Sequence, residues 1–153
     1  MRALLDVARW RQLVPGLWAG MLLCLALLAT PAPFAVLAQS DAGRVAGRML
    51  AQEAYASLAL GVLVLLLERG VARRQAQQGS GSQFSVGMAL ALAALFCTVA
   101  GYFALQPLMA TARAGQGPLS FGQLHAASAA FFVIKTCLVL LLAWRAAPPH
   151  AAL

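Results

Sequence analysis

The chain has 153 residues, of which 62% are apolar and 10% are charged, with a formal net charge of +7. Soluble domains are about 45–50% apolar and about 25% charged, and a chain this short has too much surface to hide so many apolar groups from water. The composition excludes most soluble folds, and it also excludes a disordered chain, which needs the opposite balance.

Long runs without charge identify membrane spans. A bilayer core of ~30 Å needs about 20 helical residues, and lipid offers the backbone no hydrogen-bond partners, so spans are helices or closed barrels. The runs are too long and too uniformly apolar for barrel strands. We therefore predict an all-α fold, a four-helix transmembrane bundle, with spans at about 13–37, 49–67, 84–106 and 125–144.

The first span has an alternative interpretation as a secretory signal. Arg2, Arg9 and Arg11 precede its apolar run, and residues 36–38 resemble a small-residue cleavage site. The apolar run is longer than a typical signal core, and Pro31 and Pro33 separate it from the site. These features favour a retained helix.

Small residues predict close helix packing. Gly16 and Gly20 form a small-xxx-small pair in the first span, which lets two helix backbones approach closely. We expect this pair to pack within the chain, with a homo-oligomer as the alternative. Further positions expected to support packing are Gly43, Gly47, Pro31 and Pro33.

A polar Gly/Ser-rich segment, residues 73–83, is typical of a flexible loop. It divides the bundle into two helical hairpins, 13–70 and 84–145. The second span carries Glu53 in its outer turn.

Arginines predict the orientation of the bundle. Seven lie in the N-terminal segment, the loop between the second and third spans and the C-terminal tail, against three in the other two connections: Arg2, Arg9, Arg11, Arg69, Arg73, Arg74 and Arg145 against Arg44, Arg48 and Arg113. Short loops rich in Lys and Arg stay cytoplasmic, so both termini should be cytoplasmic. The basic charge is then a topology signal, and no nucleic-acid partner is expected.

Aromatic residues lie near the predicted span ends, as interfacial aromatics do: Trp10, Trp18, Tyr102 and Trp144.

Lys135 is the most unusual residue, because it lies near the middle of the fourth span. A central lysine costs ~2.5–3.5 kcal/mol on insertion scales. Ser128 shares its helix stripe, so Lys135 should face the bundle. Candidate partners are Thr98 and Tyr102 by depth, with Glu53 a more distant one. A ligand, ion or proton site and a purely structural lysine both fit this pattern.

His125, at the outer start of the fourth span, could ligate a metal or haem or respond to pH. His150, the second histidine, lies in the tail, and Cys24, Cys97 and Cys137 lie in three different spans. We therefore predict no metal site and no cofactor. No nucleotide, zincin or hydrolase motif is present, and we expect no enzymatic activity.

Two segments together resemble a known family. The first runs from Leu17-Trp18-Ala19-Gly20 through Pro33-Phe34 to Ala42-Gly43 and Gly47; the second joins Gln106-Pro107 to Phe121-Gly122, His125 and Ser128. Their order and spacing resemble the bacterial membrane family called domain of unknown function 4149, which is similar to the eukaryotic transmembrane protein 205 family. The resemblance implies a multi-pass protein of the bacterial inner membrane with no assigned activity.

Three functions are compatible with these observations. The first is a multi-span membrane protein that binds or passes a small solute near Lys135. The second is a haem- or metal-binding redox-associated protein that uses His125. The third is a membrane assembly or scaffold protein that associates through small-residue faces.

Overall fold

Helices make up nearly all of residues 7–147, the part of the chain that the computed structural model describes. No strand occurs among these residues, which confirms the all-α prediction. The elements are α1 (Val7–Cys24), the π-helical segment η2 (Leu25–Ala29), α2 (Pro31–Val36), α3 (Gln39–Gln77), α4 (Val86–Thr98), the π-helical segment η3 (Val99–Ala104), α5 (Leu105–Arg113) and α6 (Phe121–Ala146).

Four of the helical stretches described are long and apolar enough to cross a membrane, as predicted: Arg9–Val36, Gln39–Gln77, Val86–Arg113 and Phe121–Ala146. Each is longer than its predicted span, because helices continue beyond the apolar run. The 39 residues of α3 correspond to about 58 Å at 1.5 Å per residue, about twice the ~30 Å hydrocarbon core. Glu53, in the outer turn of the predicted span, lies 14 residues after the start of α3.

The first and third spans each contain a π-helical turn followed by proline. In the first, the Thr30 N–H donates to the Leu25 carbonyl at 2.9 Å, and Pro31 opens α2. In the third, η3 precedes Pro107 of α5. Proline has no N–H and its ring clashes with the carbonyl four residues earlier, so a widened turn is one way to accommodate it.

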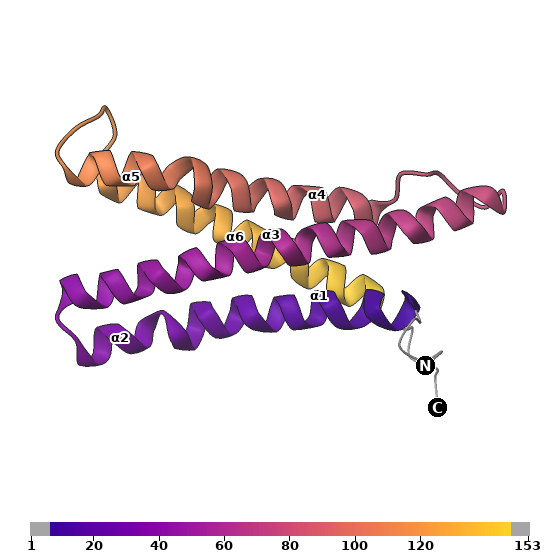
Figure 1. Cartoon of the computed structure of the whole chain (residues 1–153), viewed down its shortest axis with the longest axis horizontal. Coiled ribbons are helices and arrows are strands. Elements are labelled where there is room, and N and C mark those ends of the chain that lie inside the picture. The colour runs from indigo at the N-terminus through magenta and orange to yellow at the C-terminus, as the bar shows by residue number, and fades with distance from the viewer. Residues whose placement is uncertain (1–6, 148–153) are drawn as a thin grey trace.

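The spans form a ring in which α1 packs on α3 and α6, and α4 packs on the same two helices. The diagonal pairs are therefore α1 with α4, and α3 with α6. Figure 1 shows that α1 begins and α6 ends at the end of the bundle where α3 connects to α4. We call this the terminal end and the opposite one the distal end.

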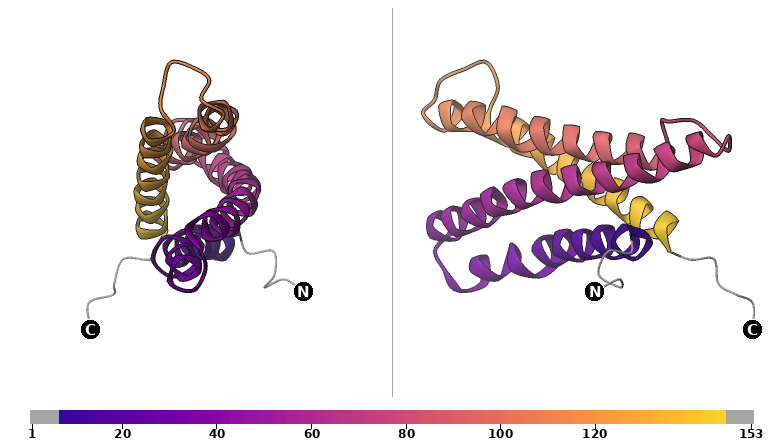
Figure 2. Two further views of the ribbon diagram at one scale, coloured as in Figure 1. Left: turned by 90° about the vertical axis from the view of Figure 1, so that its left-hand side faces the viewer. Right: turned by 45° about the vertical axis from the view of Figure 1, so that its right-hand side comes forward.

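The two halves of the bundle are packed differently. The main apolar core joins all four spans and includes Trp18, Val64 and Val139, each at most 2% exposed. Its members on α3 and α6 lie between Glu53 or Lys135 and the terminal end. Toward the distal end α2 packs on α3 and α5 packs on α6, and these two pairs diverge (Figures 1 and 2).

The glycines predicted to pack helices do not make close approaches in this chain. A Cβ atom added at Gly16, Gly20, Gly43 or Gly47 would meet no atom within 4 Å. The close approaches are at other glycines: an added Cβ would lie 2.6 Å from Leu95 at Gly61, 2.0 Å from Glu68 at Gly87 and 2.5 Å from Phe131 at Gly101. Of the two predicted prolines, Pro33 is buried and Pro31 is exposed.

Candidate functional site

Lys135 forms an ion pair with Glu53 in the interior of the bundle. The Nζ atom donates to Oε1 of Glu53 at 2.6 Å, and the two residues are only 3% and 6% exposed. The ammonium also lies 4.9 Å from the centre of the Phe132 ring, a distance at which a ring face attracts a cation. The mid-span lysine thus faces the bundle, as predicted.

A chain of side chains extends this pair to a third helix. Ser57, one turn along α3, donates its hydroxyl to Oε1 of Glu53. The indole N–H of Trp18 on α1 donates to the Ser57 oxygen at 2.8 Å. Trp18 and Ser57 are both 0% exposed, so the interfacial position predicted for Trp18 is wrong: its N–H finds an internal partner. Trp10 and Trp144 are 41% and 81% exposed.

The ion pair connects two helices that are not neighbours in the ring. Glu53 lies 14 residues after Gln39 at the start of α3, and Lys135 lies 14 residues after Phe121 at the start of α6. At 1.5 Å per residue, both are about 21 Å from the distal ends of their helices. The equal depth brings the two charges together across the diagonal of the bundle.

One oxygen of this site has no partner. Oε1 of Glu53 accepts from both Ser57 and Lys135, whereas Oε2 accepts from no residue that the structure describes. Within the same residues, no fully buried side-chain nitrogen or oxygen lacks a hydrogen bond. Oε2 is therefore not sealed by packing, although the carboxylate lies among apolar helices. The pair keeps one free acceptor position.

The predicted partners of Lys135 are engaged elsewhere. Thr98 donates its hydroxyl to the Ala94 carbonyl of its own helix at 3.0 Å, and the Tyr102 ring packs edge-on against Phe103. Glu53, the more distant of the predicted candidates, is the partner instead. Depth in the span did not identify it, because the pairing depends on which faces of α3 and α6 meet across the bundle.

Ser128 and His125 lie outside the ion-pair network. Ser128 donates to the carbonyl of Gly101 at 2.6 Å, which ties α6 to the π-helical segment η3. His125 is exposed and stacks on Phe121, with ring centres 5.7 Å apart. Arg113 also lies over the Phe121 ring, with its guanidinium carbon 4.5 Å from the ring centroid. No group of three metal-binding side chains occurs in residues 7–147, and His150 lies outside these residues.

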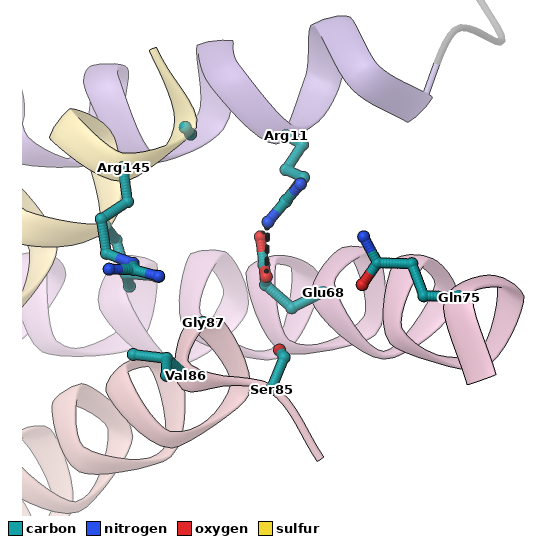
Figure 3. Close-up of a pocket in the computed structure, with 9 residues that line it drawn as sticks. Arg11, Glu68, Gln75, Ser85, Val86, Gly87 and Arg145 are labelled. Carbon is teal, nitrogen blue, oxygen red and sulfur yellow. Dashed lines mark hydrogen bonds and ion pairs between the residues drawn. The ribbon is translucent and has the colours of Figure 1, made fainter. Parts of the chain in front are cut away.

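A second polar site lies at the terminal end (Figure 3). Arg11 of α1 forms a two-bond ion pair with Glu68 of α3, its second bond being 3.1 Å long. Beside this pair is a pocket of about 240 Å³ lined by residues of all four spans. Arg145 reaches from α6 toward the start of α4 in the same pocket, where Gly87 leaves room for the Glu68 carboxylate. This pair fastens the ends of α1, α3 and α4.

Three polar contacts were not predicted from the sequence: Ser57 with Glu53, Trp18 with Ser57, and Glu68 with Arg11. A signal for the first existed: Glu53 and Ser57 are one helical turn apart and share a face. The chain has four acidic residues, so a buried lysine has few carboxylates to choose from. The tryptophan contact had no signal, because it depends on how α1 and α3 pack.

These features define a class: a multi-pass, all-helical membrane protein whose spans enclose a charged pair. The chain is also recognised at the family level. The model of the family described as Domain of unknown function (DUF4149) matches residues 13–118, and the chain belongs to this family, as its motifs predicted. Trp18, Glu53 and Ser57 fall within the matched residues, whereas Lys135, His125 and Ser128 follow them. No curated protein and no solved structure matches the chain.

Proposed function

We propose that this protein binds, and passes, a small polar solute at the Glu53–Lys135 pair, and that it does so without catalysing a reaction. The single observation that carries the proposal is the free Oε2 atom of Glu53 in an otherwise satisfied membrane interior. Ionisable residues inside a membrane are costly and commonly mark solute or proton pathways. If the ion pair served only to hold the helices together, a hydrogen bond to Oε2 would stabilise the fold further.

The proposed route to the site is from the distal end. Trp18, Val64 and Val139 belong to the apolar core that packs on the terminal side of the pair, which leaves the distal side for the proposed approach. A solute would therefore meet the charges from one side and be stopped by the apolar core. Passage to the other side would require the core contacts of α1 or α6 to move.

The proposed setting is the bacterial inner membrane, with the terminal end in the cytoplasm. Six described arginines lie at this end and three at the distal end: Arg9, Arg11, Arg69, Arg73, Arg74 and Arg145 against Arg44, Arg48 and Arg113. An excess of Arg and Lys in short loops marks the cytoplasmic side. The distal entrance would then face the periplasm.

Accessibility labelling tests the route. The three native cysteines are replaced by alanine, and a single cysteine is placed at Leu50 or at Val64. Leu50 lies one turn from Glu53 toward the distal end, whereas Val64 belongs to the buried core. A membrane-impermeant thiol reagent added to whole cells should label L50C and leave V64C unmodified. Equal protection of both positions would refute a distal entrance.

Ligand binding tests the site. Chloride, lactate, small amines and sugars are screened for their effect on thermal unfolding in detergent. A bound solute stabilises the native state by about 2.7 kcal/mol at 100 times its dissociation constant. The stabilisation should disappear in the E53L/K135M double variant, which is uncharged but keeps the volume of the pair. A shift that persists in this variant would place binding elsewhere, and no shift with any probe would overturn the proposed function.

A further inference from the structure

We infer that the site takes up one proton and one monovalent anion together, the components of a weak acid. The inference rests on the proposed function and names the class of solute. When the proton binds Oε2 of Glu53, the carboxylate becomes a neutral carboxylic acid and the contact with Lys135 Nζ breaks. The ammonium then pairs with the anion. No covalent bond between heavy atoms changes, and the site holds the same net charge before and after.

Charge balance in the bundle interior is the first reason. The Glu53–Lys135 pair is neutral as a whole, and both members are nearly inaccessible. Adding an anion alone, or a cation alone, would leave an uncompensated charge among apolar helices, which is expensive. Adding a proton and an anion leaves one cation and one anion in contact, as before. A neutral solute carries no charge that could replace either member of the pair, so the ion pair would stay closed.

The hydrogen bonds around Glu53 indicate which member accepts the proton. Its Oε2 atom has no partner, so a proton can be added there without displacing anything. The acid form keeps its bond with Ser57, which Trp18 holds in place at 2.8 Å. Lys135 has no second acceptor among residues 7–147: its other contact is the face of Phe132, 4.9 Å away. The freed ammonium therefore needs a new anion.

The groups that face the pair from all four spans allow a single protonation. They are the Trp18 indole on α1, the Ser57 hydroxyl on α3, the buried Cys97 thiol near Lys135 on α4, and the Phe132 ring on α6. None of these four groups carries a formal charge. One proton and one monovalent anion therefore satisfy the site.

The charges at the distal end favour an anion over a cation. Arg44 pairs with Asp41 at 2.6 Å. Arg48 and Arg113 then remain as uncompensated cations among the described residues of this end, since Arg113 contacts only the Phe121 ring. Positive charge at an entrance raises the local concentration of anions and repels cations. The proposed route thus leads an anion to the ammonium of Lys135.

Trp18 provides a built-in reporter of the site, because its N–H is bonded to the serine that contacts Glu53. In a W10F/W144F variant, Trp18 is the only tryptophan left of three. We expect its fluorescence to change saturably with sodium lactate or sodium acetate in detergent at constant ionic strength. The apparent affinity should rise about tenfold for each unit by which pH falls, since one proton binds with each anion. Choline salts of the same anions should give the same curves.

Substitutions of Glu53 and Lys135 distinguish the binding of the proton from the binding of the anion. E53Q carries a permanently neutral side chain with the same shape, so it should bind the anion with no dependence on pH. K135Q should bind no anion, and E53Q/K135Q, which has no buried charge, gives the same comparison if the single variant does not fold. Wild-type binding without pH dependence would overturn the coupling and leave the proposed function standing. Binding confined to cations or neutral probes would do the same, whereas the absence of any solute response would overturn both.

Discussion

Glu53 and Lys135 are 82 residues apart in the chain and 2.6 Å apart in the structure. They lie on diagonally opposite helices, at equal depth from the distal end, and each offsets part of the cost of burying the other's charge. This contact joins the first half of the chain to the second in the membrane interior. It is therefore both a structural tie and the centre of the proposed solute site.

Breaking this pair should destabilise the protein more than removing it. Removing one member of a buried ion pair costs about 3–5 kcal/mol, because the other charge stays buried, while replacing both members with apolar residues is often neutral or stabilising. We expect E53L and K135M each to unfold at a clearly lower temperature than the wild type. The E53L/K135M double variant should recover most of the difference. Circular dichroism in detergent measures the three midpoints, and additive losses would contradict a direct pair.

Replacing a glycine where two helices approach closely should lower the thermal midpoint of unfolding, whereas replacing a glycine that faces outward should not. At Gly87 an added Cβ would lie 2.0 Å from the Glu68 carboxylate, whereas at Gly20 it would meet nothing within 4 Å. We expect G87A to lower the thermal midpoint by displacing Glu68 from Arg11. The matched control G20A should be neutral or stabilising, since alanine favours helix by about 1 kcal/mol over glycine.

A double variant at the exposed glycines of α1 tests the alternative of a homo-oligomer. Gly16 and Gly20 are exposed on α1, so any close contact they make is with another molecule. If the chain oligomerises through this pair, G16A/G20A should shift the detergent-corrected mass toward the monomer. An unchanged mass in both proteins would remove these glycines from any interface.

His125 should give no chromophore to the purified protein. It is exposed at the distal end and stacks on Phe121, away from the buried pair. We expect an absorption spectrum without a Soret band, and the same solute response in H125A as in the wild type. A Soret band in the wild type that H125A removes would support the haem-binding alternative.

We expect both termini of the chain to lie in the cytoplasm. We expect a C-terminal green fluorescent protein fusion to fluoresce and a C-terminal alkaline phosphatase fusion to be inactive, because the arginine-rich end stays inside. A phosphatase inserted in the 114–120 connection should be active. The reverse pattern would invert the proposed orientation and place the solute entrance in the cytoplasm.

Much of the architecture could be predicted from local sequence, whereas the site could not. The four spans follow from the lengths of the apolar runs, because a bilayer offers the backbone no hydrogen-bond partners and an apolar run of sufficient length crosses it as a helix. Lys135 was identified because a charge in such a run is exceptional. Glu53 was only the more distant of its candidate partners, because hydropathy does not reveal which residues of α3 face α6. Trp18 was misplaced for the related reason that distance from a span end does not reveal which face a residue occupies.

The sequence by itself determined that this is a helical membrane protein with four apolar helices long enough to cross a bilayer, and which single charge does not fit. Those properties depend on the transfer of each segment between water and lipid, and this free energy is set by local composition. Only the tertiary structure decided that Lys135 meets Glu53, that Ser57 and Trp18 hold the carboxylate, and that Oε2 stays free. These contacts depend on helix register and on the order of helices around the ring, which arise from packing between segments far apart in the chain.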